Sequence, residues 1–526
     1  MQILKKPSAI LFSSLTGLFL AFSFPKFDFE VLAWLGFIPL FFAIEGRRGL
    51  QSFWLGFLAG LLFYSIGLHW IINTLVNFGN ISPLLGYPIL FLLAAYLAVF
   101  IGLFSWIVSS LIDKDPRNIL LAPLFWTSFE YLRSTHSELG FSWLGLGYSQ
   151  YKNLSIIQIS EFTGVYGVSA LIILTNSAIY LALREWFFSE SFKDAFSKKY
   201  LITAISFTSI ILMGSWGYGL FNLKNKTNEK GPQIKATLIQ GNIEQKLKWE
   251  KKYSKNILDV YERLTRASVQ NNPDIVIWPE ASLPFFYNLE IPETLWLNQL
   301  TKSLGIPILV GSQYLEKNNS GKYIYYNSAY FLKPDSIDKV RRYDKIHLVP
   351  FGEFIPFSNV LSFVKKFVYV PGELGRGEKI SLFELDSSKF GVSICYEITF
   401  PDLVRKSVKK GAKFLVTITN DAWFGDSAAS YQHIGIAALR AVENQTPILR
   451  AANTGISGAI DASGKIYDST KIFIEETVQT TIRPRQGQPT YYSKNGDVFS
   501  LACIGLALIL GFFVIRTTED KNFSKT

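Results

Sequence analysis

Three segments in the second half of this 526-residue sequence each combine an apolar run with a residue that can do chemistry. The segment "DIVIWPE" ends at Glu280, "RRYDKIHLVPFGEFIP" contains Lys345, and "GVSICYE" contains Cys395. Together they supply what acyl transfer through a covalent intermediate requires. The thiolate attacks a carbonyl carbon, the carboxylate accepts the thiol proton, and the ammonium favours the thiolate and stabilises the oxyanion.

Each of these residues also has an ordinary structural explanation. A free cysteine is more often buried and inert than reactive, and a lysine is usually a solvated surface charge. Glu280 is equally suited to the N-terminus of a helix, where its charge would be favourable. The hypothesis therefore depends on whether the fold brings the three segments together.

Histidines offer a rival chemistry, because a cysteine–histidine pair would need neither the lysine nor the glutamate. The sequence has four histidines, at His69, His136, His347 and His433. His347 lies two residues after Lys345, and His433 falls in the first turn of an amphipathic segment, so we expect supporting or packed roles for both. No HExxH, CxxC, GxSxG, Walker or GxGxxG pattern is present, so we expect no metal and no cofactor.

Residues 234–482 alternate strand-length apolar runs with amphipathic segments of helical length. The runs include "KATLIQGNI", "DIVIWPE", "IPILVGSQYL", "KFGVSICYE" and "AKFLVTITND", and the amphipathic segments include "SKNILDVYERLTRASVQNN" and "ASYQHIGIAALRAVENQ". This alternation predicts an α/β domain. Because ligands bind at the carboxyl ends of strands in such sheets, the three reactive segments are expected to converge on one pocket.

The rest of the chain is typical of a membrane protein. Hydrophobic residues make up 49% of the sequence and aromatic residues 15%, and the net charge is +11. Basic residues sit beside apolar segments, which favours membrane over nucleic-acid binding. Eight apolar stretches approach the roughly 20 residues that span a bilayer, the second and fifth being short: residues 8–24, 31–44, 53–72, 84–111, 119–132, 165–183, 200–221 and 498–515.

The distribution of lysine and arginine predicts the orientation. The alternate loops, such as "NTLVNFGNIS", are poor in basic residues. By the positive-inside rule, both termini are cytoplasmic and the α/β domain lies on the opposite side. The basic residues used are Lys5, Lys6, Arg47, Arg48, Lys114, Arg117, Arg184, Lys193, Lys198, Lys199, Arg516, Lys521 and Lys525.

The sequence therefore predicts a membrane α-helical bundle of about eight transmembrane helices plus an α/β domain. We expect a helical domain of seven spans at 1–222, a linker at 223–233 and the catalytic domain at 234–482. A second linker at 483–497, a C-terminal transmembrane helix at 498–515 and a cytoplasmic tail at 516–526 complete the chain.

Taken together, "WPE", "DKIHLVPFGEFIP", "ICYE" and "TNDAWFG" resemble, in this order, the carbon–nitrogen hydrolase (nitrilase) superfamily. The resemblance implies an αββα sandwich with a Glu–Lys–Cys triad. By that resemblance Glu280 is the general base, Lys345 the oxyanion stabiliser and Cys395 the nucleophile. Glu353, Tyr396 and Glu397 are expected as supporting residues.

A nitrilase-like domain that lies between seven predicted membrane spans and one further span resembles the apolipoprotein N-acyltransferase family. This resemblance covers nearly the whole chain. "QGNIEQKLKWE", "HLVPFGEFIP", "RAANTGISGAID" and "GFSWLGLGYSQY" look like segments of that family. The resemblance implies that an acyl chain moves from a membrane phospholipid to a thioester on Cys395. The chain then passes to the N-terminal amine of a diacylglyceryl-cysteine lipoprotein. It also implies a bacterial inner (plasma) membrane protein with a periplasmic catalytic domain.

Aromatic residues near the reactive segments predict an apolar entrance, which suits lipid substrates. We expect Trp249 and Trp423 to bind substrate or form a lid. The other aromatic residues considered are Phe285, Phe286, Tyr287, Phe363, Phe367 and Phe424. The expected partners are the phospholipid donor, the lipoprotein acceptor and the membrane, without nucleic acid, and the chain is expected to be a monomer.

Two other functions remain open from the residues alone. A membrane-tethered amidase or nitrilase would use the same triad with water as acceptor. A transporter or receptor with a non-catalytic sensor domain is the third possibility, and an intact triad argues against it. Glu130 and His69, both inside apolar stretches, are expected to face the interior of the bundle or an interface.

Overall fold

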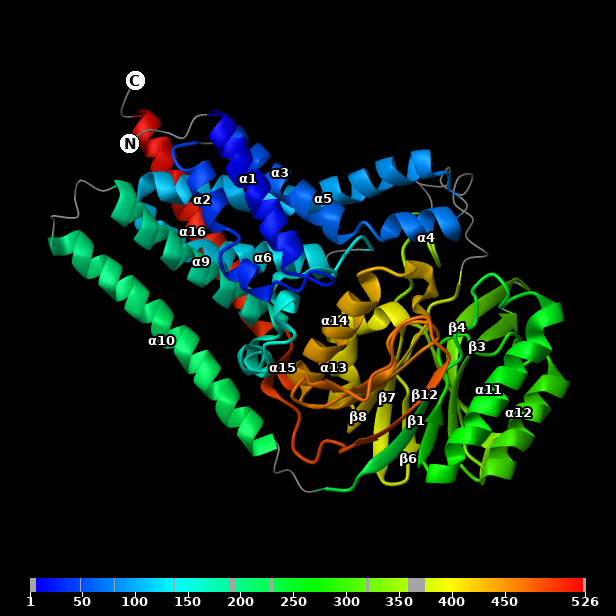
Figure 1. Ribbon diagram of the computed structural model, residues 1–526. Helices are drawn as coiled ribbons and strands as arrows, with labels where there is room; N and C mark the ends of the chain where they lie inside the picture. Colours follow the sequence, from blue (N-terminus) through cyan, green and yellow to red (C-terminus); the bar gives the residue numbers. More distant parts are fainter. Residues whose placement is uncertain are drawn as a thin grey trace. The chain divides into compact units, whose positions relative to one another are not determined.

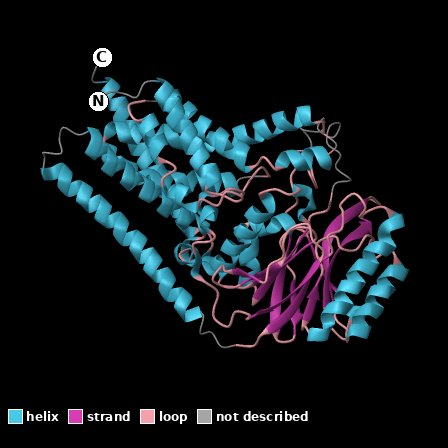
Figure 2. Cartoon of the chain, viewed as in Figure 1, coloured by secondary structure: helices cyan, strands magenta, loops and turns pink. Residues whose placement is uncertain are grey.

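The computed structural model describes residues 6–47, 49–79, 81–135, 138–188, 195–226, 231–317, 321–357 and 374–523. The chain divides into two compact units (Figures 1 and 2). The helical unit consists of Met1–His69, Tyr87–Asn222 and Asn495–Thr526. The α/β unit consists of Trp70–Gly86 and Leu223–Lys494.

The helical unit is built from long apolar helices joined by short turns and 3-10 helices. Its longer helices are α1 (Lys6–Phe22), α2 (Ile38–Ile44), α3 (Leu50–Gly67), α5 (Pro83–Lys114), α6 (Ala122–Thr135), α9 (Val165–Phe188), α10 (Ala195–Lys226) and α16 (Val498–Phe523). Its shorter elements are η1 (Glu30–Trp34), η2 (Pro116–Leu121), η3 (Leu146–Gln150), α7 (Leu154–Ile157) and α8 (Ser160–Thr163).

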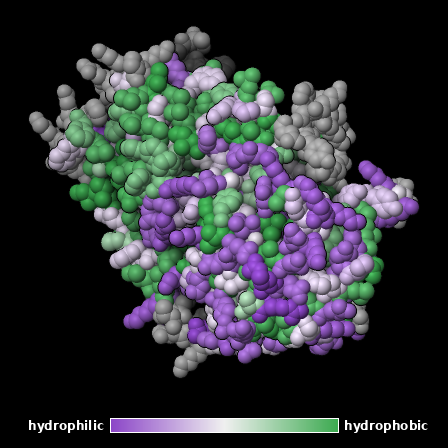
Figure 3. Space-filling model, turned by 45° about the vertical axis from the view of Figure 1, so that its right-hand side comes forward, coloured by the Kyte–Doolittle hydropathy of each residue, from purple (hydrophilic) through white to green (hydrophobic). Residues whose placement is uncertain are grey.

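Within the described residues, four helices are long and apolar enough to cross a membrane, and they lie in α3, α5, α9 and α10. They coincide with four of the eight predicted stretches, whereas the first, second and eighth stretches form shorter apolar helices. Helix α10 exposes large apolar side chains that suit contact with lipid: Ile202, Phe207, Ile210, Met213, Trp216 and Phe221. The surface of the helical unit is accordingly largely hydrophobic in Figure 3.

The fifth predicted stretch lies within η2 and α6, and α6 carries two buried charged residues. Glu130 accepts a hydrogen bond from the backbone N–H of Leu146 at 2.5 Å. Arg133 donates to the carbonyl oxygens of Phe141 and Trp143, both at 2.8 Å. These contacts fix the loop after α6, so both charged side chains have a structural role in the interior of the helical unit. The total of eight spans stays a prediction.

The described part of the α/β unit contains two six-stranded sheets. The first sheet has the order β12-β1-β2-β3-β4-β5 and the second β11-β10-β9-β8-β7-β6. The strands of the first sheet are β1 (Ile234–Gln240), β2 (Ile275–Ile277), β3 (Ile308–Lys317), β4 (Tyr323–Leu332), β5 (Arg341–Asp344) and β12 (Glu476–Ile482). Those of the second are β6 (Leu382–Leu385), β7 (Ser388–Ile394), β8 (Phe414–Thr419), β9 (Ile448–Ala452), β10 (Gly458–Ile460) and β11 (Ile466–Tyr467).

Helices cover the outer face of each sheet (Figure 1). Helices α11 (Ser254–Ser268) and α12 (Ile291–Leu304) lie along the first sheet, and α13 (Pro401–Lys409) and α14 (Ala429–Asn444) along the second. One core lies between the sheets and includes Leu238, Phe331, Phe390 and Val416. Separate cores lie under each helix pair. This four-layer arrangement confirms the predicted αββα sandwich.

The central strands show why the sequence folds this way. β8 reads "FLVTIT" and is buried at every position, as expected of a strand covered on both faces. β1, β2 and β3 run parallel in the first sheet, and β7, β8 and β9 run parallel in the second. Each set of parallel strands therefore ends at a common edge of its sheet, where ligand sites form in such folds.

A short helix from the first part of the chain belongs to the α/β unit. Helix α4 (Ile71–Asn77) lies within Trp70–Gly86, although these residues precede the expected domain boundary at residue 222. The remaining short elements of this unit are η5 (Lys251–Tyr253), η6 (Val269–Asn271), η7 (Ile337–Lys339), η9 (Cys395–Thr399), η10 (Asp421–Phe424) and, at its boundary, α15 (Tyr491–Asn495).

Candidate active site

The three reactive residues each follow a strand of the α/β unit. Glu280 comes after β2, Lys345 directly after β5, and Cys395 directly after β7. All three side chains are buried. The Nζ atom of Lys345 lies 3.6 Å from Oε1 of Glu280, and the charges of both residues act on the thiol of Cys395. The structure therefore brings the three sequence segments to one place.

Glu280 is held by one donor on each carboxylate oxygen. Asn327, on β4, donates from Nδ2 to Oε1 at 2.7 Å, and the backbone N–H of Asn420 donates to Oε2 at 2.9 Å. The loop that carries Glu280 lies very close to Gly311 of β3. A Cβ atom at Gly311 would come within 2.5 Å of the backbone nitrogen of Ala281, so this approach requires glycine.

Lys345 lies between two carboxylates. Its Nζ atom is 2.7 Å from Oε1 of Glu353, in addition to its contact with Glu280. Burial alone would lower the pKa of Lys345, but the carboxylates of Glu353 and Glu280 outweigh it and raise this pKa. The amine therefore stays protonated. Glu353 also accepts from the backbone N–H of Val349 at 2.8 Å, which fixes its own loop.

Cys395 occupies a sharp turn between β7 and η9. Its φ angle of 52° lies in the left-handed region, which is uncommon for a residue with a side chain. Burial and then the negative charge of Glu280 raise the pKa of the thiol, against the opposing effect of Lys345. The resting group is therefore a thiol, and its activation requires a base.

Glu397 ties the turn of Cys395 to the segment of Lys345. Its carboxylate accepts from the backbone N–H of Ile394 at 2.7 Å and from that of Ile346 at 2.6 Å. It also accepts from the hydroxyl of Tyr343 at 2.9 Å. Burial raises the pKa of Glu397 to about 7, although the backbone N–H donors and the charge of Lys345 oppose the shift. Glu397 therefore links the two sheets beneath the site.

A second buried polar cluster supports the cysteine from the side of α14. The Nε2 atom of His433 lies 3.2 Å from the carbonyl oxygen of Cys395, and its Nδ1 atom lies 3.2 Å from Oδ1 of Asp421. Arg450, on β9, donates from Nη2 to Oδ2 of Asp421 at 2.8 Å. Burial and then the charge of Arg450 lower the pKa of His433, so the imidazole is neutral.

The two tryptophans expected at the substrate entrance are both partly exposed, Trp249 at 44% and Trp423 at 37%. Trp423 lies in η10 and is contacted by α4. Asn73 and Thr74 donate to its carbonyl oxygen at 3.2 and 2.9 Å, and the ring of Phe78 packs edge-on against its indole, 5.0 Å between centroids. Helix α4 therefore helps to position Trp423.

The other residues considered from the sequence take packing roles or lie outside the described residues. The ring of His347 stacks on Phe400 with centroids 4.2 Å apart, and its backbone N–H donates to Glu397. Tyr396 packs edge-on against the same phenylalanine. His136, Phe363 and Phe367 lie outside the described residues.

Several residues that hydrogen-bond to the side chains of the site were not predicted from the sequence. Asn327 contacts the carboxylates of both Glu280 and Glu353, the latter at 3.4 Å. Asn420 and Asp421 stand in the "TND" motif, so the end of β8 was a signal for them. No comparable signal marks Asn327 or Arg450, which lie inside strands.

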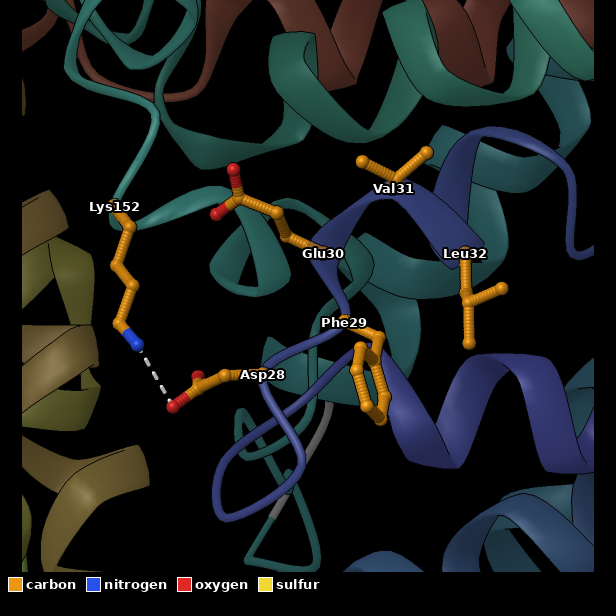
Figure 4. A pocket seen from close by; sticks show the side chains of 6 residues that line it. All are labelled: Asp28, Phe29, Glu30, Val31, Leu32 and Lys152. Atoms are coloured by element: carbon orange, nitrogen blue, oxygen red, sulfur yellow. Dashed lines mark hydrogen bonds and ion pairs between the residues drawn. The ribbon is translucent and has the colours of Figure 1, made fainter.

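A separate pocket lies in the helical unit and contains none of the predicted site residues. It is lined by Asp28, Phe29, Glu30, Val31, Leu32 and Lys152. Figure 4 shows Lys152 and Asp28 pointing toward one another, and their ion pair measures 2.8 Å. The charges that line this pocket are thus largely satisfied by each other.

Comparisons with known proteins agree with this architecture. A family model described as "Apolipoprotein N-acyltransferase N-terminal domain" matches residues 16–178. A second, described as "Carbon-nitrogen hydrolase", matches residues 235–492. The first matched region lies in the helical unit except for Trp70–Gly86, and the second lies within the α/β unit.

Relatives match the chain over nearly its whole length. Apolipoprotein N-acyltransferase of Geobacter metallireducens is 36% identical over 507 residues, covering 96% of this chain and 95% of that protein. The enzyme of that name from Pasteurella multocida is 32% identical over 507 residues, covering 95% and 93%. That from Haemophilus influenzae is 31% identical over 517 residues, covering 97% and 95%. The predicted family is confirmed: the chain belongs to the apolipoprotein N-acyltransferase family.

Proposed function

We propose that the protein transfers an acyl chain from a membrane phospholipid to the N-terminal amine of a diacylglyceryl-cysteine lipoprotein through a thioester on Cys395. One observation carries the proposal: the buried thiol of Cys395 lies within the influence of Lys345 and Glu280, whose Nζ and Oε1 atoms are 3.6 Å apart. The reaction then has two half-reactions at one cysteine, which is a ping-pong mechanism.

In the first half-reaction, the carboxylate of Glu280 accepts the thiol proton as the sulfur attacks the ester carbonyl of the phospholipid. A carbon–sulfur bond forms, and the ammonium of Lys345 stabilises the oxyanion. The bond to the glycerol oxygen then breaks, and this oxygen takes the proton from Glu280. The products are the thioester and a lysophospholipid.

In the second half-reaction, the amine nitrogen of the lipoprotein attacks the thioester carbonyl and gives a proton to Glu280. Lys345 again stabilises the oxyanion, the carbon–sulfur bond breaks, and Cys395 recovers its proton from Glu280. The product is an amide. Glu353 supports this role, since its carboxylate lies 2.7 Å from Nζ of Lys345, takes no part in the proton transfers and keeps the amine protonated through both steps.

A protein of this family acts on substrates that are anchored in lipid, and the apolar helices of the helical unit suit a bacterial inner membrane. Holding the active site at the bilayer avoids extracting acyl chains into water, which costs about 0.8 kcal/mol per CH₂. We infer a periplasmic α/β unit and cytoplasmic termini from the positions of the basic residues. The inclusion of α4, from a predicted non-cytoplasmic loop, in the α/β unit supports the same orientation.

Intact mass spectrometry after incubation with phospholipid tests the proposal. We expect an adduct with the mass of one acyl chain on Cys395, which disappears in Cys395→Ala and is unchanged in Cys503→Ala. Addition of a diacylated lipopeptide should discharge the adduct and give N-acylated product. If the lipopeptide is present and only free fatty acid is released from the adduct, the protein is an amidase rather than an acyltransferase. If the adduct persists in Cys395→Ala, Cys395 is not the nucleophile.

The orientation is tested separately with a reporter fused after Asn222. A cytoplasmic signal from this reporter would overturn the proposed orientation.

A further inference from the structure

The α/β unit contains a second buried lysine, which the proposed reaction does not use. Lys248 has no exposed surface, whereas its neighbours Lys246 and Trp249 are exposed. Its Nζ atom donates to the backbone carbonyl oxygen of Glu280 at 3.2 Å. Lysine is almost never fully buried without a strong reason. The contact therefore joins this lysine directly to the residue that is proposed to be the base.

Lys248 lies near the end of a segment, Asn242–Trp249, that crosses the edge of the sheets where the site lies. The segment follows β1, and its start is held by Asn453, which follows β9. Asn453 donates to the carbonyl oxygen of Ile243 at 2.8 Å and accepts from its backbone N–H at 2.9 Å. The start of the segment is thereby fixed to the second sheet.

The middle of the segment reaches the site through Asn420. The side chain of Asn420 donates from Nδ2 to Oε1 of Gln245 at 2.5 Å, and its backbone N–H donates to Glu280. Lys248 then makes the last attachment before Trp249. The segment is thus tied to the loops after β2, β8 and β9, and the exposed tryptophan stands at its far end.

Burying the ammonium of Lys248 carries a cost that one carbonyl oxygen offsets only in part. Burial lowers the pKa of Lys248 to about 8, and the carboxylate of Glu280 is the charged group that opposes the shift. The hydrogen bond is charge-assisted only while the amine is protonated, and such bonds are roughly twice as strong as neutral ones. The attachment is therefore strongest below this pH.

We propose that Lys248 is a positioning residue for the acyl transfer, which clamps the segment Asn242–Trp249 to the backbone of Glu280 and so holds Trp249 in place for the acyl chain of the substrate. The inference deepens the proposed function and depends on it. Lys248 touches no reacting atom. It acts by keeping the base and the tryptophan in fixed relation to each other.

The test compares Lys248→Met with Lys246→Met, which removes an exposed lysine two residues earlier in the same segment. The rate of thioester formation on Cys395 is measured in single turnovers with phospholipid vesicles, so that no acceptor amine contributes to the pH dependence. We expect kcat/KM of this half-reaction to fall about tenfold in Lys248→Met, through KM more than kcat, and to stay unchanged in Lys246→Met.

The pH profile separates a clamp from a general structural role. In the wild type, kcat/KM should decline as the pH rises through about 8, because Lys248 loses its proton. In Lys248→Met this decline should be absent, while Lys246→Met should keep it. A Lys248→Met protein with the rate and profile of the control would overturn the inference.

Two outcomes keep this inference distinct from the proposed function. A wild-type protein that forms no acyl-enzyme contradicts the proposed function itself. A wild-type protein that forms it at a rate without any alkaline decline contradicts the role of Lys248. This second measurement needs no variant, so it can overturn the inference even if Lys248→Met does not fold.

Discussion

The Nε2 atom of His433 lies 3.2 Å from the carbonyl oxygen of Cys395, so this histidine holds the backbone of the residue that carries the thiol. Nη2 of Arg450 lies 3.1 Å from Nδ1 of His433, and because a guanidinium only donates, Nδ1 is the acceptor nitrogen of the neutral ring. Nε2 therefore carries the hydrogen and donates it to the carbonyl oxygen of Cys395. The same nitrogen cannot accept a proton from sulfur. This geometry argues against a cysteine–histidine pair and for a base from elsewhere, for which Glu280 is the candidate.

His433→Leu should slow thioester formation about tenfold or more, because the carbonyl of Cys395 loses its donor and the turn is no longer held at its positive φ angle. His433→Gln retains a donor of similar reach and should recover most of the rate. Single-turnover acylation of both variants, with thermal unfolding as the control for folding, measures this. Equal rates for the leucine and glutamine variants would show that the hydrogen bond is not the reason for the effect.

Glu280→Gln should reduce the rate of thioester formation by about 100-fold or more, since general base catalysis contributes effects of this size. The amide has nearly the shape of the carboxylate and can still accept from the backbone N–H of Asn420. Alkylation of Cys395 by iodoacetamide, followed by intact mass, should slow as well. Normal acylation in this variant would remove Glu280 from the role of base.

Glu397 should make stability and activity respond to pH in opposite directions. Its pKa is raised from 4.5 to about 7 in the folded chain, so folding takes up a proton between these values. Stability from this group is full below pH 4.5 and is lost as the pH rises through 7, by about 3 kcal/mol in total.

Activity should instead rise over the same range, because the ionised carboxylate accepts from Ile346 and Ile394 with both oxygens. Thermal unfolding and acylation rates between pH 5.5 and 7.5, below the expected alkaline decline from Lys248, test both trends, with Glu397→Gln as the variant that cannot titrate. A constant difference in unfolding temperature between wild type and Glu397→Gln would contradict the expected linkage.

Gly311→Ala should displace the loop of Glu280. The added Cβ would lie 2.5 Å from the backbone nitrogen of Ala281 and 2.8 Å from the Cα atom of Glu280, and backbone cannot yield as a flexible side chain can. We expect a destabilisation of about 1–3 kcal/mol together with slower acylation. Gly487→Ala, where no atom lies within 4 Å of the new Cβ, is the matched control and should change neither property.

The sequence pattern predicts an α/β domain and the positions of the three reactive residues for one physical reason, whereas the αββα sandwich is implied by the resemblance to the nitrilase superfamily. Central strands that are buried on both faces read as continuous apolar runs, and a polar residue at the end of such a run stands out. "GVSICYE" and "AKFLVTITND" are examples, and they form β7 and β8 with Cys395 and Asn420 directly after them. The fold class and the family are confirmed, whereas the catalytic roles stay predictions.

The supporting contacts could not be predicted, because they join residues that are distant in sequence and ordinary in their local pattern. Asn327 lies inside a strand of aromatic residues, and its contact with Glu280 follows only from the pairing of β3 with β4. Lys248 alternates with Lys246 in a polar turn, and nothing local indicates which of the two is buried. For His433 the expectation of a packed, hydrogen-bonded role agrees with the structure, although its partner could not be named.

Helix α4 makes the α/β unit discontinuous along the chain, and this affects the order in which the protein can be completed. The hydrogen bond from Trp70 to Gln432 joins residues 362 positions apart. On the ribosome, α4 is therefore made long before its partners, and the site is finished only after nearly the whole chain has been synthesised. A soluble fragment that begins at residue 223 would contain Glu280, Lys345 and Cys395, but the carbonyl of Trp423 would lack both donors from α4.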